Sequence, residues 1–181
     1  IAHRAAYQAF MAGCSELEIS AAYLKACRAT EDDMPYTIIA GLNEHAAVLH
    51  HNRPDTTAPA TLRSLLIDAG VDVYGYASDI TRTYAYDPNS EFAAMIELFD
   101  SKQQEIAAAT TLGQSLLDLN HLSHQKVAEV LEAFNLITIS SEAAVETRLT
   151  DTFYPHGVGH HLGCRVHDKG GLYNNTKGEQ T

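Results

Sequence analysis

Two aspartates eleven residues apart, Asp68 and Asp79, are the first groups in this sequence whose type and spacing could do chemistry. Asp68 ends the apolar run 65–67, and an ionised carboxylate in a buried strand needs a cation or several hydrogen-bond donors. A turn centred on Val73 and Tyr74 would place the two aspartates opposite each other in a hairpin. Because neighbouring carboxylates repel, a bound metal ion is one common remedy.

Four histidines gather in a short glycine-rich stretch near the end of the chain. They are His156, His160, His161 and His167. Imidazole suits first-row divalent metals, and mixed Asp/His sites favour Mn, Co, Fe or Zn over Ca. A lone histidine is usually structural or solvated, but four so close together are not all expected to be structural. They favour a metal centre over the alternative in which Asp79 pairs with Arg82 and Asp68 caps a turn.

Both motifs resemble the signatures of a known family. Asp68–Gly70 followed by Gly75–Thr83 resembles the twin-aspartate signature of the metallopeptidases with the pita-bread fold. Pro155–Gly163 and Val166–Asp168 look like the histidine signature of the same family, which includes methionine aminopeptidase, aminopeptidase P, prolidase and creatinase. Asn43–His50 resembles the bacterial prolidases (Xaa-Pro dipeptidases) in particular. The resemblance covers nearly the whole chain.

The resemblance implies two divalent metal ions, with manganese expected first and cobalt, zinc or iron as alternatives. Asp68 would bind one ion, Asp79 would bridge both and His160 would bind the second. The family uses two further glutamates downstream, and Glu179 lacks the hydrophobic surroundings expected of either. Residues 1–181 are therefore expected to form part of a catalytic domain, without the family's N-terminal domain and C-terminal glutamates, and to be inactive alone.

Other residues take their expected roles from the same resemblance. His156 and His167 would contact the substrate and stabilise the tetrahedral intermediate, while His50 and Tyr36 would face the substrate. For each of these four, a solvated loop residue is the alternative. Structural roles are expected for His45, His51 and His161, and surface positions for His3, His121 and His124.

The implied reaction is hydrolysis of the Xaa-Pro bond in dipeptides by a hydroxide that bridges the two ions. One alternative is an aminopeptidase P that acts on longer Xaa-Pro peptides, and chain-length preference would separate the two enzymes. A second alternative is a non-catalytic relative that binds peptides or proteins. Such relatives typically lose metal ligands, whereas Asp68, Asp79 and His160 are all retained.

Composition narrows the possible binding partners and the cellular compartment of the protein. A formal net charge of −11 argues against binding to nucleic acid, and no apolar run approaches the ~18–20 residues of a membrane span. Three cysteines without CxxC spacing fit a reducing cytoplasm better than a disulfide framework. The expected partners are a proline-containing dipeptide and, in the intact protein, a second copy of the chain.

The expected elements mix helices and strands without a strict βαβ alternation, which indicates an α+β fold with antiparallel strands. A helix over residues 1–29 is interrupted near Gly13, and Ser15 with Glu18 resembles a capping box. Strands are expected over residues 36–40, 64–73 and 80–86, with 46–50 as a further candidate. Helices are expected from residue 90 past residue 109 and over residues 118–134, and a polar loop over residues 170–181.

Overall fold

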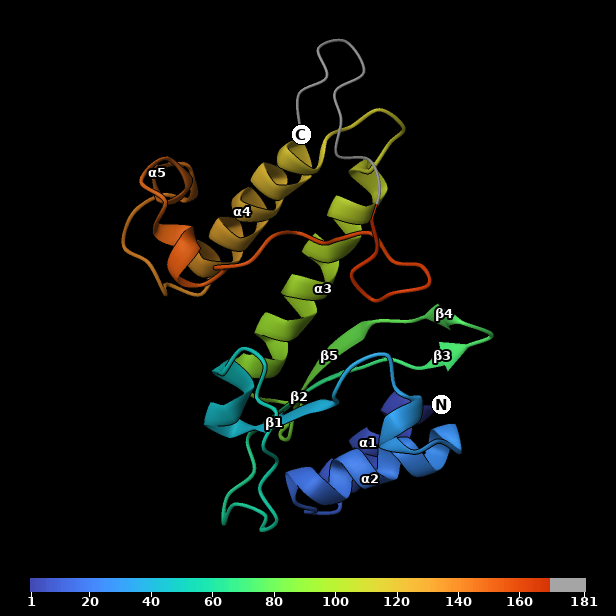
Figure 1. The fold of residues 1–181 in the computed structure, drawn as a ribbon. Coiled ribbons are helices and arrows are strands. Elements are labelled where there is room, and N and C mark those ends of the chain that lie inside the picture. The colour runs from blue at the N-terminus through green and yellow to red at the C-terminus, as the bar shows by residue number, and fades with distance from the viewer. Residues whose placement is uncertain (170–181) are drawn as a thin grey trace. The chain divides into compact units, whose positions relative to one another are not determined.

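The structure is a computed structural model that describes residues 1–169 (Figure 1). Within that range the chain forms two compact units, residues 1–93 with 161–168, and residues 94–160 with residue 169. The expected polar loop 170–181 and Glu179 lie outside the described residues. In the part of the chain that the structure covers, no helix is both long and apolar enough to cross a membrane.

Two short helices open the first unit and are separated where the sequence predicts. The first unit contains, in chain order, α1 (Ala2–Met11), α2 (Glu16–Cys27), η1 (Glu31–Asp33), β1 (Ile39–Leu42), η2 (Asn43–Ala47), β2 (Ser64–Ala69), β3 (Asp72–Val73), β4 (Tyr76–Ala77) and β5 (Ile80–Ala85). Gly13 takes a left-handed φ of 84°, which ends α1. Ser15 and Glu18 form the expected capping box, because each satisfies the other's backbone N–H at the start of α2.

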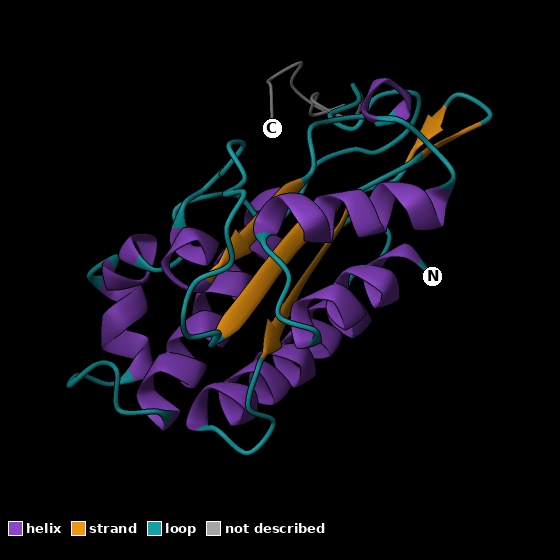
Figure 2. Ribbon diagram, turned by 90° about the horizontal axis from the view of Figure 1, so that it is seen from below, coloured by secondary structure: helices purple, strands orange, loops and turns teal. Residues whose placement is uncertain are grey.

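The three-stranded antiparallel sheet has the order β1-β2-β5, and Figure 2 shows its strands side by side in orange. The helices α1 and α2 pack against each other and against β1 and β2. Phe10 from α1, Ile19 from α2, and Leu65 and Ile67 from β2 are fully buried between these layers. This core holds β2, and therefore Asp68, in place.

The hairpin from β2 to β5 forms as predicted, but its turn lies one position further along the chain. Tyr74 (φ 56°) and Gly75 (φ 81°) occupy the turn, and positive φ at both central residues is typical of a tight hairpin. Asp68 therefore pairs with Thr81 rather than with Asp79. Asp79 lies diagonally across from Asp68, at a spacing that side chains can still bridge.

Two predicted strands need correction. The first begins at Ile39 instead of residue 36, because Tyr36 turns its side chain toward the aspartates before sheet pairing starts. Residues 46–50 form no strand: residues 46 and 47 end η2, a 3-10 helix that begins at Asn43, and residues 48–50 form a bend and a turn. Asn43 has a left-handed φ of 52°, and its side chain accepts a hydrogen bond from the Arg63 N–H at 2.8 Å, which turns the chain away from the sheet.

The second unit is helical. Its elements are α3 (Glu91–Ala109), whose first residues belong to the first unit, α4 (Leu116–Ala133), α5 (Ser141–Glu146) and η3 (Leu149–Thr152). The two long helices match the predicted ones to within two residues. Ion pairs join them, with Lys102 Nζ 2.7 Å from Glu129 Oε2 and Lys126 Nζ 2.9 Å from Glu105 Oε2.

Candidate metal centre

The hydroxyl of Tyr36 joins the two aspartates of the hairpin. Its oxygen lies 2.6 Å from Asp68 Oδ1 and 2.8 Å from Asp79 Oδ1. A phenol carries one O–H proton, so it donates to one carboxylate at a time. The second short contact then needs a proton on a carboxyl group, or a cation. The two carboxylates thus converge within one small, half-buried volume.

The electrostatics of this group follow from burial and crowding. Burial raises the pKa of Asp68, the nearby Asp79 charge raises it further, and the hydrogen bond from Tyr36 opposes the rise without cancelling it. Burial is also the largest cause of the raised pKa of Tyr36, followed by its bonds to the two carboxylates. Tyr36 therefore stays protonated and supplies a hydrogen bond to the carboxylate pair, not a positive charge.

A close backbone approach just beyond Asp68 brings the two strands together. The Ser78 N–H donates to Val71 O at 2.9 Å, and the Val71 N–H donates to Ser78 Oγ at 2.9 Å. Gly70 leaves the room for this contact, since a Cβ built on it would lie 1.7 Å from Ser78 O. A side chain at position 70 would separate the segments that carry Asp68 and Asp79.

The donor set fits a divalent cation. Asp68 and Asp79 offer carboxylate oxygens that share one hydrogen-bond donor, and a divalent ion would neutralise both charges. Carboxylate oxygens are ligands for Mg, Ca, Mn and, with imidazole, for Zn and Fe. These two residues could hold one ion or share a pair.

Part of the histidine motif lies beside the same hairpin. The Ala77 N–H donates to Gly163 O at 2.8 Å, which attaches segment 161–168 to β4. The segment is folded on itself, because the Cys164 N–H donates to Asp168 Oδ2 at 2.9 Å. His167 lies in this segment, within the same unit as Asp79. His160 belongs to the second unit, so its convergence with the aspartates stays a prediction.

His156 lies in the second unit, where aromatic contacts hold its segment against α4. The ring of Tyr154 lies edge-on to His124 and to His156, with ring centroids 5.2 Å and 4.7 Å apart. The Val158 N–H donates to Asn120 Oδ1 at 3.1 Å. His124, expected at the surface, is instead largely buried, and its Nδ1 lies 2.9 Å from Thr150 Oγ1. The imidazole of His124 thus packs against Tyr154, in the loop that carries His156.

His50 is exposed and has a left-handed φ of 58°. The structure brings its neighbours His45 and His51 together on a residue that the sequence analysis did not single out, the buried Glu16. These two histidines have the structural contacts expected of them. His3, expected at the surface, is half-buried, with its Nε2 2.8 Å from Ile80 O.

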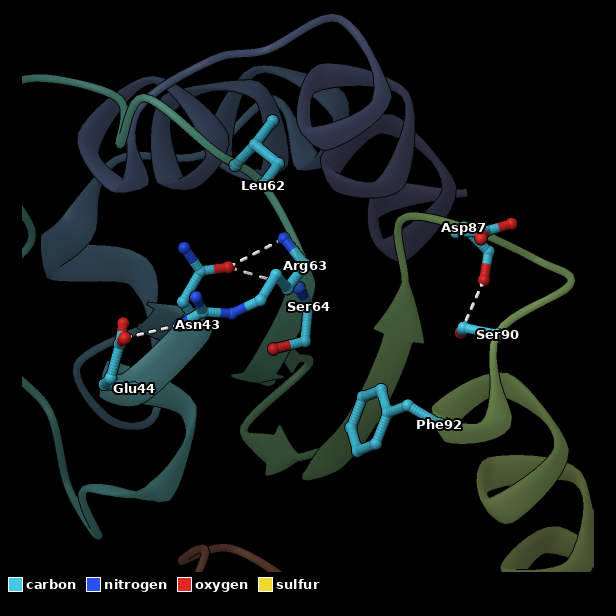
Figure 3. Close-up of a pocket in the computed structure, with 8 residues that line it drawn as sticks. All are labelled: Asn43, Glu44, Leu62, Arg63, Ser64, Asp87, Ser90 and Phe92. Atoms are coloured by element: carbon cyan, nitrogen blue, oxygen red, sulfur yellow. Dashed lines mark hydrogen bonds and ion pairs between the residues drawn. The ribbon is translucent and has the colours of Figure 1, made fainter.

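A separate cavity of about 460 Å³ lies in the first unit, between the start of β2 and the start of α3 (Figure 3). Its lining includes an ion pair between Arg63 and Glu44, together with Asp87 and Phe92. None of the site residues predicted from the sequence lines it. The carboxylate pair, rather than this cavity, is therefore the candidate site.

Comparison with known proteins identifies the family to which this arrangement belongs. A sequence model of metallopeptidase family M24 matches residues 1–181. The chain belongs to metallopeptidase family M24. The family membership agrees with the resemblance of both the twin-aspartate and the histidine motifs.

Curated relatives of the chain are bacterial Xaa-Pro dipeptidases. The one from Cronobacter sakazakii is 45% identical over 177 residues, which cover 97% of this chain and 40% of that protein. The one from Yersinia pseudotuberculosis serotype O:1b is 46% identical over 179 residues, 98% of this chain and 40% of that protein. The chain thus spans about 40% of the length of these relatives.

Solved structures of aminopeptidase P share the fold. Pseudomonas aeruginosa aminopeptidase PepP matches with a TM-score of 0.84 at 24% identity, over 98% of this chain and 41% of that one. Zinc-substituted Escherichia coli aminopeptidase P in complex with product matches with a TM-score of 0.80 at 22% identity, over 94% and 39%. The predicted α+β, pita-bread fold with antiparallel strands is confirmed.

Proposed function

We propose that the intact protein is a metal-dependent Xaa-Pro dipeptidase. The observation that carries this proposal is the convergence of Asp68 and Asp79 on one hydroxyl, in a chain of family M24 that is 45% identical to an Xaa-Pro dipeptidase. Two half-buried carboxylates that converge on one hydroxyl suit a metal centre, because a divalent ion would neutralise their repulsion. The tertiary amide before proline lacks an N–H, so general proteases cleave it poorly and a dedicated enzyme is needed.

In this proposal Asp68, Asp79 and His160 would be the metal ligands within the chain, and Asp79 would contribute to both ions. Manganese is the first candidate, with cobalt, zinc and iron as alternatives. When bound, divalent ions supply a water of lowered pKa and positive charge near the scissile carbonyl. The chain's own contribution is to fix the two carboxylates across the hairpin, so that no reorganisation is needed when the substrate arrives.

The remaining roles belong to histidines and a tyrosine. His167 and His156 donate to the oxyanion that develops on the carbonyl oxygen. His50 and Tyr36 face the substrate, and the Tyr36 hydroxyl also keeps Asp68 and Asp79 oriented through its contacts of 2.6 and 2.8 Å. The attachment of Gly163 to Ala77, at 2.8 Å, supports the position of His167 on the hairpin side of the site.

A second candidate is an aminopeptidase P, which the fold likeness to aminopeptidase P structures favours at 22–24% identity. The dipeptidase is preferred, because the sequence identity to Xaa-Pro dipeptidases is about twice as high. The proposed partners are a proline-containing dipeptide and a second copy of the chain. The proposed compartment is the cytoplasm, and binding to nucleic acid or membrane is not part of the proposal.

The test uses the full-length protein, freed of metal by chelation and reloaded with Mn²⁺. Ala-Pro should be hydrolysed only after reloading, and faster than a longer peptide that begins with Ala-Pro. Asp79→Asn should abolish the metal-dependent rate, because a charge that serves both ions is lost. Asp32→Asn removes an exposed carboxylate in η1 and is the matched control, with a rate like wild type.

Preference for the longer peptide would point to the aminopeptidase P alternative. No metal-dependent hydrolysis of either peptide by the reloaded protein would overturn the proposal.

A further inference from the structure

A buried carboxylate outside the candidate metal centre organises one loop of the first unit. The side chain of Glu16, in the first turn of α2, is only 1% exposed. Its Oε1 accepts hydrogen bonds from the Leu42 N–H and from His45 Nδ1, each at 2.8 Å. Its Oε2 accepts from His51 Nε2 and from the Asp55 N–H, also at 2.8 Å.

The four donors span one segment of chain, from the end of β1 at Leu42 to Asp55. His50 lies inside that span and adopts a left-handed backbone, with φ 58°. A non-glycine residue holds such a conformation only where its surroundings fix it. Glu16 bonds to the residue directly after His50 and to residues on both sides of it. We propose that Glu16 is a positioning residue that fixes segment 42–55 and, through it, the orientation of His50.

This inference rests on the proposed function only in the role it gives to His50, that of facing the substrate. The stability of the hydrogen-bonded cluster around Glu16 does not depend on that role. A buried carboxylate is stable only where several donors replace water, and here two backbone N–H groups and two imidazoles do so. The two imidazoles also stack, with ring centroids 4.3 Å apart at 30°. All four donors must stay in place together to satisfy the carboxylate, which restrains segment 42–55.

The titration behaviour of the cluster is consistent with this account. Burial raises the pKa of Glu16, but hydrogen bonds from Asp55, Leu42, His51 and His45 outweigh it and leave the pKa below its ordinary value. The bond to Glu16 raises the pKa of His45, against its burial. Asp55 and Glu44 are the other charged groups that face His45, and both raise its pKa as well. The carboxylate is thus ionised, and it favours a charged His45.

The same three side chains also meet the distance requirement of a metal site. One ligand atom each from Glu16, His45 and His51 lies within 4.8 Å of the others. However, each Glu16 oxygen already accepts two hydrogen bonds, and an ion would have to replace both imidazole donors. The hydrogen-bonded cluster explains the buried carboxylate without an ion, and a bound ion is an outcome that the test can detect.

The decisive variant is Glu16→Gln in the full-length enzyme, with Glu18→Gln as its matched control. Gln at position 16 removes the charge and presents an N–H₂ to groups that are themselves donors. Glu18 lies in the same helical turn and bonds to Ser15, a capping role that Gln also fills. Glu16→Gln is expected to raise KM for Ala-Pro about tenfold, the effect of a 1.4 kcal/mol loss, with kcat nearly unchanged. Glu18→Gln is expected to leave KM within about twofold.

A second substitution distinguishes a positioning role of Glu16 from a general loss of structure in the variant. If Glu16 acts through His50, then His50→Ala should raise KM by itself, and adding Glu16→Gln should raise it little further, because the two residues act in series. Additive effects would overturn the inference. Hydrogen exchange supplies a readout that needs no activity: the amides of Leu42 and Asp55 should exchange faster in Glu16→Gln and unchanged in Glu18→Gln.

Unchanged exchange at both amides in Glu16→Gln would also overturn the inference, whatever the kinetics. A wild-type enzyme without activity on Ala-Pro would contradict the proposed function, but the hydrogen-exchange test of the Glu16 inference would remain valid. The metal content of both variants is also measured. A stoichiometric ion that is lost in Glu16→Gln yet retained in Asp79→Asn would show that Glu16, His45 and His51 form a second metal site, and would overturn the inference.

Discussion

The close approach at Gly70 gives a sharp prediction for Gly70→Ala in the full-length protein. An alanine Cβ there would lie 1.7 Å from Ser78 O and 3.1 Å from Tyr36 Cε1. Real Cβ atoms essentially never approach a neighbour within 3.0 Å, so the Ser78 carbonyl must retreat by at least 1.3 Å, from 1.7 to 3.0 Å. The clash is with backbone, so no side-chain rotation relieves it. Overpacking typically costs ~1–3 kcal/mol, and we expect a loss of about 3 kcal/mol or more.

The displacement also has a functional consequence, because it separates the segments that carry Asp68 and Asp79. Urea unfolding followed by circular dichroism measures the free energy of unfolding, and calorimetric titration with Mn²⁺ measures metal affinity. Both should fall in Gly70→Ala. The control is Gly157→Ala, since a Cβ there meets nothing within 4 Å, and its stability should stay within about 0.5 kcal/mol of wild type. Wild-type stability and wild-type Mn²⁺ affinity in Gly70→Ala would refute the reasoning.

Three further predictions concern single groups. His167→Ala should keep the metal content and lower kcat by ~10²–10³, the loss expected for one oxyanion donor, and metal loss in that variant would make the residue a ligand. Ser15→Ala should cost ~1 kcal/mol and speed exchange of the Glu18 amide, because it removes half of the capping box. The pKa of Glu16 is lowered in the folded protein, so its hydrogen bonds stabilise the fold above about pH 4.3, and this stability is lost as the pH falls through the folded-state pKa. The pKa of His45 is raised in the folded protein, so its bond to Glu16 stabilises the fold below about pH 6.5, and this stability is lost as the pH rises through the folded-state pKa. Protection of the Asp55 amide should therefore be greatest between those pH values, and a flat profile would contradict the cluster.

Elements with local signals were predictable from the sequence. The capping box at Ser15, the two long helices and the hairpin around Gly75 each follow from residues within a few positions of one another. The twin aspartates were predictable for the same reason, since eleven residues and one tight turn suffice to bring Asp68 and Asp79 together. An offset of one position in the turn changed their register but left both on the same side of the hairpin.

What the sequence could not show depends on contacts between distant residues. Glu16 stands in the first turn of a helix, where acidic residues are common, and nothing nearby marks it as a partner of His51, 35 residues later. The same holds for Tyr36, whose hydroxyl reaches Asp79 across 43 residues. The candidate strand at 46–50 failed because the conformation at Asn43 is set by its bond to Arg63, twenty residues away.

The short loop between Asp68 and Asp79 also determines which part of the candidate site can form first during translation. Hairpins form in about 1–10 μs, so the two carboxylates can meet as soon as β5 leaves the ribosome. His160 follows Asp79 by 81 residues, which takes roughly 4–16 s at ~5–20 residues per second. The twin aspartates must therefore tolerate each other before the histidine motif exists. Tyr36 is made earlier than either, so its hydroxyl can donate to one of them when they first come together, and a proton on a carboxyl group can relieve their repulsion until metal is bound.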